Sequence, residues 1–145
     1  MTETCRKYLV FTLHERRYAV DLALVAEVEE PPILWPIPGA PACYPGAMNF
    51  HGAIVAVMDL AAFFGHPASH ALEKVVVLAP GVASLALLVE QVESIVPADQ
   101  VQCDHTRHSD DRYSSGTLLL ADGCDALLLD IVELVRDASS RIAAA

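Results

Sequence analysis

The stretch from Ala47 to Met58 reads AMNFHGAIVAVM, and its pattern indicates the class of fold. Two short apolar runs, 47–50 and 54–58, flank His51-Gly52-Ala53, which predicts two strands joined by a tight hairpin turn. Asp59 follows directly and can cap a short helix over 60–64, which the glycine at 65 ends. The stretch therefore predicts β-structure interrupted by very short helices.

The rest of the chain shows the same pattern of short strands and turns. Residues 8–14 alternate strictly and predict a half-buried strand, and Asp122-Gly123 is the strongest local hairpin signal. Further strands are expected at 18–20, 74–79, 84–90, 92–96, 117–121 and 126–129. The polar stretch 99–115 lacks apolar periodicity and is expected to be a solvated loop, and 131–137 is predicted to be a closing helix. Many short strands with few helices predict a mainly β, antiparallel, barrel-like protein.

Length and composition predict one domain over residues 1–145, because 145 residues of which 54% are hydrophobic can bury a core. Flexible tails are expected at 1–7 and 138–145. The longest apolar stretch, 75–89, is broken by Pro80-Gly81, so no membrane insertion is expected. No signal peptide is recognisable, and a cytoplasmic location is expected. The net charge of −10, with no Lys or Arg between Tyr18 and Glu73, argues against nucleic acid and favours a protein or small-molecule partner.

Catalytic motifs are sparse. Neither glycine-rich phosphate loop nor the esterase G-x-S-x-G occurs, and no cofactor is expected. Cys43 could act as a nucleophile with His51 as its base, but no cationic residue lies near Cys43 in sequence to lower the thiol pKa, so a buried structural cysteine is favoured. A zinc site could draw on Cys103, His105 and His108, although the polar stretch around them favours a solvated loop.

Trp35, among prolines, is either a core residue or an exposed binding anchor.

The ordered series of short motifs resembles the CheW-like family of chemotaxis coupling proteins over residues 8–136. The resemblance rests on Phe11-Thr12-Leu13, Tyr18-Ala19-Val20-Asp21-Leu22, Val25, Glu27-Val28, Ile37-Pro38-x-x-Pro41, the run from Tyr44 to Gly52, the run from Ile54 to Leu60, Phe64-Gly65, Leu88-Val89-Glu90-x-Val92, Gly123 and Leu128-Leu129-Asp130.

The resemblance implies two small five-stranded β-barrel subdomains that share a hydrophobic seam. It also implies a non-catalytic adaptor that joins a CheA-type histidine kinase to the cytoplasmic tips of chemoreceptors. The partner-binding residues that it implies are Glu27, Val28, Pro38, Gly46, Asn49, Phe50 and His51, of which Gly46 is also explained by backbone geometry and Phe50 by the core.

The departure from the family pattern that matters most is at His51. The family's Asn-Leu-Arg-Gly is here Asn49-Phe50-His51-Gly52, which exchanges a permanently charged side chain for one that is mostly neutral near pH 7. A divergent coupling protein, serving a chemosensory array other than that for swimming, is therefore one alternative. A small metal-dependent enzyme and a stand-alone ligand sensor are the others.

Overall fold

The computed structural model describes residues 6–66, 73–104 and 113–144, with side chains as far as Ser140. In chain order the elements are β1 (Lys7–Leu13), β2 (Arg16–Asp21), η1 (Leu22–Leu24), β3 (Val25–Glu29), β4 (Gly46–Phe50), β5 (Ala53–Asp59), α1 (Leu60–Phe63), β6 (Lys74–Leu78), β7 (Leu85–Val89), β8 (Gln91–Pro97), η2 (Ala98–Gln100), β9 (Gln102–Asp104), β10 (Ser114–Leu119), β11 (Asp125–Leu129) and α2 (Ile131–Ala144).

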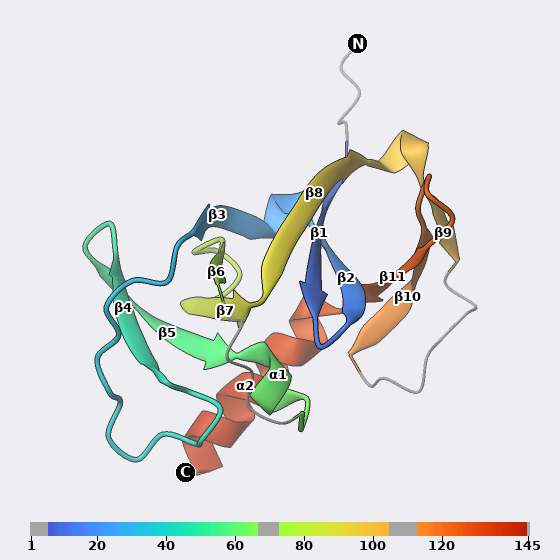
Figure 1. Cartoon of the computed structure of the whole chain (residues 1–145). Coiled ribbons are helices and arrows are strands. Elements are labelled where there is room, and N and C mark those ends of the chain that lie inside the picture. Colours follow the sequence, from blue (N-terminus) through green and yellow to red (C-terminus); the bar gives the residue numbers. More distant parts are fainter. Residues whose placement is uncertain (1–5, 67–72, 105–112, 145) are drawn as a thin grey trace.

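The first sheet contains strands from both ends of the chain, in the order β8-β1-β2-β11-β10-β9. Its two halves join where β2 runs parallel to β11, with Tyr18 opposite Leu127. Only residues 98–101 separate its edge strands β8 and β9 along the chain, and the sheet curls so that these edges approach each other (Figure 1). The hairpin predicted at Asp122-Gly123 is confirmed as the antiparallel pair β10–β11.

The second sheet is built from the middle of the chain, in the order β3-β6-β7-β5-β4. The hairpin predicted over 47–58 is confirmed, because β4 pairs antiparallel with β5, and the strands expected at 74–79 and 84–90 pair antiparallel as β6 and β7. A parallel pairing of β5 with β7 joins the two hairpins. The chain thus leaves the first sheet after β2, completes the second sheet and returns as β8.

Three hydrophobic clusters hold the described residues together, and the largest lies between the sheets. Phe11 and Tyr18 from the first sheet meet Met58 and Leu87 from the second in this central cluster. Each sheet also encloses a smaller cluster on its other face, around Val10 and Leu118 in the first and around Met48 and Val77 in the second. Two curved sheets joined by a shared apolar seam match the expected architecture.

The predicted half-buried character of 8–14 is wrong, because β1 is buried on both faces. Leu9, Phe11 and Leu13 pack in the central cluster, while Tyr8 and Val10 pack inside the first sheet. A strand with neighbours on both sides, in a sheet that is covered on both faces, has no solvated face, so its alternation separates two cores rather than core from water.

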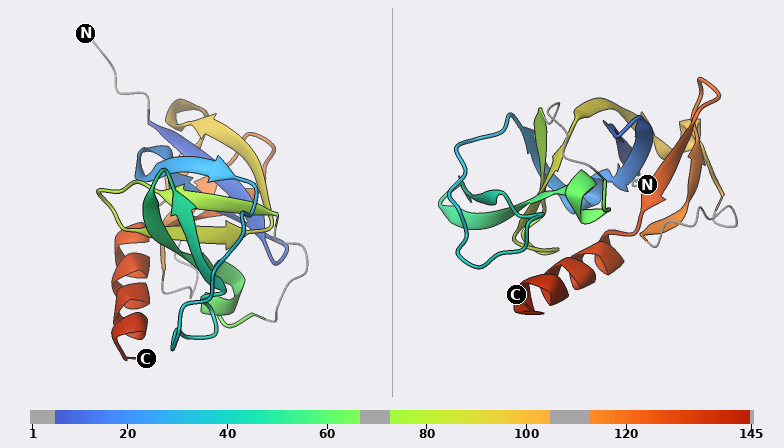
Figure 2. Two further views of the ribbon diagram at one scale, coloured as in Figure 1. Left: turned by 90° about the vertical axis from the view of Figure 1, so that its left-hand side faces the viewer. Right: turned by 60° about the horizontal axis from the view of Figure 1, so that its bottom comes forward.

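The closing helix is longer than predicted. Helix α2 continues beyond Asp137 to Ala144, so residues 138–144 are helical where a tail was expected. Ala138 is buried in the central cluster, and its carbonyl accepts a hydrogen bond of 3.2 Å from the Tyr44 hydroxyl. Figure 2 shows α2 running from the first sheet past α1 toward the loop before β4. Tertiary contacts therefore extend a helix whose sequence alone predicted an earlier end.

The mainly β class with a C-terminal helix is confirmed, and the first sheet has six strands where five were expected. The additional strand, β9, has three residues and lies in the stretch that was expected to be a loop, where Cys103 pairs with Leu118 of β10. Among the described residues, no helix combines the length and apolar character that crossing a membrane requires.

Candidate functional site

The turn between β4 and β5 is a rigid two-residue hairpin turn. His51 and Gly52 both have positive φ angles, 51° and 88°, as a type I′ turn requires. The side-chain oxygen of Asn49 accepts a hydrogen bond of 2.8 Å from the Gly52 N–H and fixes the turn further. The turn therefore holds the His51 side chain at its tip, where 75% of it is exposed.

The His51 ring meets an acidic pair on β3, although β3 and β4 are the opposite edges of the second sheet. Its Nε2 lies 3.3 Å from Oε2 of Glu27, a contact that is an ion pair only when the imidazole is protonated. Glu27 and Glu29 pair with Val77 and Val75, so both carboxylates leave β3 on the face that covers the interior cluster of this sheet. We call Glu27, Glu29 and His51 the acidic cluster.

Partial burial raises the pKa of Glu29, and the neighbouring Glu27 carboxylate raises it further, whereas His51 acts in the opposite direction. These effects have a simple electrostatic origin, because partial burial and a nearby negative charge both disfavour the ionised form of the Glu29 carboxyl group. The acidic cluster contains two carboxyl groups and one histidine, so it has an excess of negative charge that a cation from another molecule would offset.

An extended segment before β4 covers part of the edge of the second sheet, at the end of β4 away from the turn. Trp35 exchanges two backbone hydrogen bonds with Ala47, of 2.9 and 2.8 Å. A Cβ atom at Gly46 would lie 2.7 Å from the Trp35 carbonyl oxygen, so this close approach requires a residue without a side chain. Gly46 therefore permits the segment to pair with β4.

Alternation along this segment leaves two large apolar side chains in water. Leu34 packs toward the interior cluster of the second sheet, while Ile33 and Trp35 point away from it and are 81% and 57% exposed. Ile54 of β5 is 64% exposed. Trp35 lies opposite Ala47, and Ala47 and Ile54 belong to the same face of the β4–β5 ladder, so these side chains share one face. We call Ile33, Trp35 and Ile54 the outer apolar face.

The structure brings together four of the seven predicted partner-binding residues. Glu27 and His51 are in contact, Asn49 holds the turn, and the Phe50 ring lies edge-on to the His51 ring at 4.4 Å while packing against the interior cluster. The remaining three residues are structurally separate: Val28 packs in the central cluster, Gly46 lies beneath Trp35 at the far end of β4, and Pro38 is exposed in a turn that the Ala40 N–H closes on the Ile37 carbonyl.

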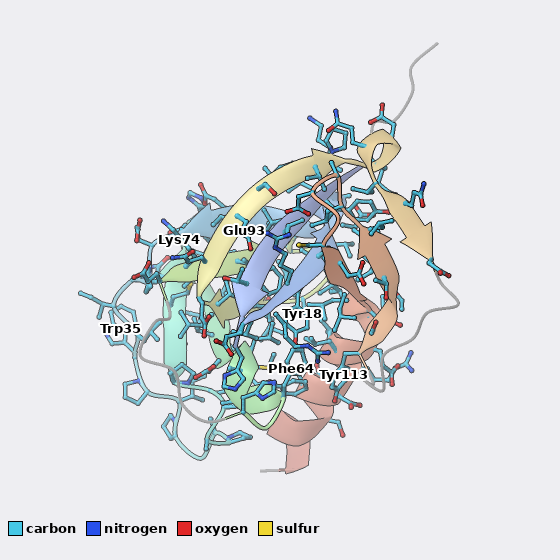
Figure 3. The ribbon with its side chains drawn as sticks, turned by 45° about the vertical axis from the view of Figure 1, so that its right-hand side comes forward. Tyr18, Trp35, Phe64, Lys74, Glu93 and Tyr113 are labelled. Atoms are coloured by element: carbon cyan, nitrogen blue, oxygen red, sulfur yellow. The ribbon has the colours of Figure 1, made fainter. Side chains whose placement is uncertain are left out.

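Sequence reasoning missed Glu29, Ile33 and Ile54. The available signal was the alternation Ile33-Leu34-Trp35, which the surrounding prolines masked. The structure also decides between the two alternatives for Trp35, which is an exposed residue held by its backbone and not part of the core. In Figure 3, Trp35 lies at the edge of the molecule, away from the buried Tyr18 near its centre.

The alternative with Cys43 as nucleophile and His51 as base fails on geometry. Cys43 is buried, and its carbonyl accepts a hydrogen bond from Asp59 at the end of β5, whereas His51 precedes the start of that strand. Seven residues of strand separate the two positions by about 20 Å. The two side chains are therefore too far apart to exchange a proton.

The zinc alternative lies partly outside the described residues, since His105 and His108 belong to the undescribed range 105–112. Cys103 is described, and burial, followed by the nearby Asp104, raises its thiol pKa, which disfavours the metal-binding thiolate. Within 6–66, 73–104 and 113–144, no three histidine, cysteine or acidic side chains gather as ligands for a metal ion.

Comparisons with known proteins agree with this fold. The family model of the CheW-like domain matches residues 7–139. A chemotaxis protein CheW from Rhizobium meliloti (strain 1021) is 28% identical over 98 residues, which are 66% of this chain and 63% of that protein. The crystal structure of the scaffolding protein TtCheW from Thermoanaerobacter tengcongensis superposes with a TM-score of 0.73 at 22% identity, covering 87% of this chain and 89% of that one. Because the family model spans almost the whole sequence, this chain belongs to the CheW-like family.

Proposed function

We propose that this protein is a non-catalytic adaptor of a chemosensory array, which binds a CheA-type histidine kinase and couples it to the cytoplasmic tips of chemoreceptors in the cytoplasm. The observation that carries the proposal is the family match over residues 7–139. The two similar proteins, a chemotaxis protein and a scaffolding protein, point in the same direction.

The candidate site supports binding rather than catalysis. His51 and Glu27 stand 75% and 45% exposed on a turn and an edge strand, open to a large partner. Catalytic sites instead exclude water around the reacting groups, which strengthens electrostatic interactions there. An open surface with a rigid hairpin suits contact between folded proteins.

The direct test is a titration of the purified protein with the regulatory domain of the CheA-type kinase from the same genome, and separately with a receptor cytoplasmic fragment. We expect saturable binding to both, and a change in kinase autophosphorylation only when all three are mixed. Absence of binding to kinase and receptor alike would contradict the adaptor role, and turnover of a small substrate by the purified protein alone would replace it with an enzyme.

His51→Arg tests whether the β4–β5 turn belongs to the contact surface. Arginine would add a permanent positive charge beside Glu27, so a partner adapted to the acidic cluster should lose affinity by about two- to fivefold, the range of an exposed ion pair. His14→Arg is a matched control, because His14 is also an exposed histidine with positive φ in a hairpin turn. Equal kinase and receptor affinities for both variants and the unmodified protein would remove the turn from the site.

A further inference from the structure

The two edge strands of the second sheet meet through side chains. Strands β3 and β4 are its edges, and β6, β7 and β5 lie between them in the hydrogen-bonded order. The sheet nevertheless curls far enough that Nε2 of His51, at the tip of the β4–β5 hairpin, lies 3.3 Å from Oε2 of Glu27 on β3. This contact joins the two edges, and we call the His51–Glu27 contact the clasp.

The hairpin tip that carries His51 projects beyond the rest of the sheet. Strand β5 pairs with β4 over residues 53–57, but its pairing with β7 covers only 56–59. Residues 53–55 therefore have β4 as their strand partner on one side and no paired strand on the other. A two-stranded ribbon is by itself only marginally stable in water. The position of the tip consequently depends on its side-chain contacts, of which the clasp is one.

The clasp also borders the interior cluster of this sheet. Phe50, whose ring meets the His51 ring edge-on at 4.4 Å, packs against that cluster, and Val55 of the tip is buried in it. From the other edge, Glu27 lies opposite Val77, which is a further buried member. Movement of the tip away from β3 would therefore expose apolar side chains to water at the gap between the two edges.

Negative charge predominates around the clasp. Burial raises the pKa of Glu29, and the neighbouring Glu27 raises it further, while His51 acts in the opposite direction. Glu30, the next residue of the chain, is held by the Lys74 ammonium of β6 at 2.7 Å. Strand β4 has no charged residue, and the acidic residue of β5 is at its other end. Because Lys74 is engaged by Glu30, the positive charge that faces this acidic pair is that of His51.

His51 makes the strength of the clasp a function of pH. The ring nitrogen of a neutral imidazole can share one hydrogen bond with the Glu27 carboxylate, whereas an imidazolium adds the attraction of opposite charges. A histidine ordinarily gains its charge near about pH 6.5, and glutamates ordinarily stay ionised down to roughly pH 4–5. The contact is therefore strongest between these limits. It weakens as the pH rises and the imidazole loses its proton, and also at lower pH, where the carboxylates gain theirs.

We propose that the clasp is a pH-sensitive device that holds the hairpin tip against β3 at mildly acidic pH and releases it as the pH rises above neutrality. The first sheet has no such sensitivity in its corresponding contacts, because Arg17 reaches Glu93 of β8 at 3.2 Å and Asp122 at 2.8 Å with a charge that is permanent over this range. The inference concerns the conformation of the chain and is independent of the proposed adaptor role.

Native-state hydrogen exchange of the backbone amides of residues 48–55 tests the clasp, with each rate divided by that of an unstructured chain at the same pH. In the unmodified protein, protection should be about two- to fivefold higher at about pH 5.5 than at about pH 8, the range of an exposed ion pair. His51→Arg should keep the higher protection at both pH values, because its charge is permanent, and His51→Gln should keep the lower. Both replacements are ordinary L side chains at the same φ of 51°, so they share the backbone cost of this turn.

His14→Gln is the matched control, because His14 is also an exposed histidine with positive φ in a hairpin turn, and this variant should retain the pH dependence of the tip. The amides of the β10–β11 hairpin are an internal control and should be protected equally at the two pH values. Replacing both Glu27 and Glu29 with glutamine should remove the pH dependence of the tip while His51 stays in place. These side chains lie at the surface of a turn and an edge strand, so the fold should persist, which thermal unfolding verifies.

Two results would overturn the inference. Equal protection of the tip at both pH values in the unmodified protein would show that the clasp does not hold the hairpin. A pH dependence that His51→Gln retains would assign the effect to another titrating group. Because neither measurement uses the kinase or a receptor, failure of the adaptor role leaves this inference standing, and failure of the clasp leaves the adaptor role standing.

Discussion

Gly46 shows how a single residue determines which surface this protein presents. The Trp35 backbone lies so close to β4 that a Cβ atom at position 46 would stand 2.7 Å from the Trp35 carbonyl oxygen. We expect Gly46→Ala to cost about 1–3 kcal/mol of unfolding free energy, because the backbone pairing of Trp35 must shift to admit the methyl group. Urea unfolding measures this as a lower midpoint with an unchanged slope.

The control for that substitution is Gly81→Ala, where an added Cβ meets no atom within 4 Å. This change should be neutral or slightly stabilising, since it reduces the freedom of the unfolded chain. Equal losses at positions 46 and 81 would show that the close approach of Trp35 does not explain the glycine.

For single residues, the sequence predicted the chemical character of the site better than it predicted which side chains are exposed. The polar members of the site, Glu27, Asn49 and His51, were all named because they belong to the family's motifs. In the structure Asn49 and His51 lie at the β4–β5 turn, and Glu27 contacts His51 from β3. Trp35 could not be assigned from sequence, because whether an aromatic residue among prolines is buried depends on which strand it pairs with. That pairing is a long-range contact, which local patterns do not reveal.

Arg17 connects elements that are distant along the chain. From β2 its guanidinium reaches Asp122 in the β10–β11 turn at 2.8 Å and Glu93 of β8 at 3.2 Å. The pKa of Asp122 lies below its ordinary value, first because the Cys124 backbone N–H donates to the carboxylate and then because of Arg17. A carboxyl group whose pKa falls on folding stabilises the protein above its unfolded pKa, and this contribution disappears as the pH falls through the folded value.

Asp122→Asn should therefore lower stability slightly at pH 7, and the difference from the unmodified protein should close as the pH falls below about 4. Urea midpoints measured across this range give the difference directly. In an Arg17→Ala background the difference at pH 7 should shrink without vanishing, because the Cys124 N–H remains. A difference that persists at the acid end would attribute the effect to the shape of the side chain and not to its charge.

Turns and helix caps were predicted from the sequence where local signals agree. Strands and helix ends that form only through tertiary contacts were missed. The turn at His51-Gly52 and the cap at Asp59, whose side chain accepts from the Ala62 N–H, are local and were predicted. Strand β9 forms only because β10 lies beside it, and the last turns of α2 form beside Tyr44, which is 94 residues away from Ala138 in sequence. Neither partner is visible in a window of neighbouring residues.

The stability of the whole molecule depends more on the apolar cluster between its two sheets than on either sheet alone. That cluster takes buried residues from both sheets and from both helices, and it is larger than the two interior clusters together. Because each sheet covers a face of the other, separating them would expose the largest apolar surface that the described residues bury. We therefore expect the two sheets to unfold as one cooperative unit.

Leu87→Ala tests this cooperativity, because Leu87 of β7 is fully buried in the central cluster. The cavity should cost about 2–5 kcal/mol, and the slowest-exchanging backbone amides of β1 and of β6 should lose that protection equally in native-state hydrogen exchange. Leu119→Ala makes the same truncation at a side chain that is 39% exposed, and should have a much smaller effect. If only the second sheet exchanged faster, the sheets would be independent folding units, and the seam would be an interface between them rather than the core of one domain.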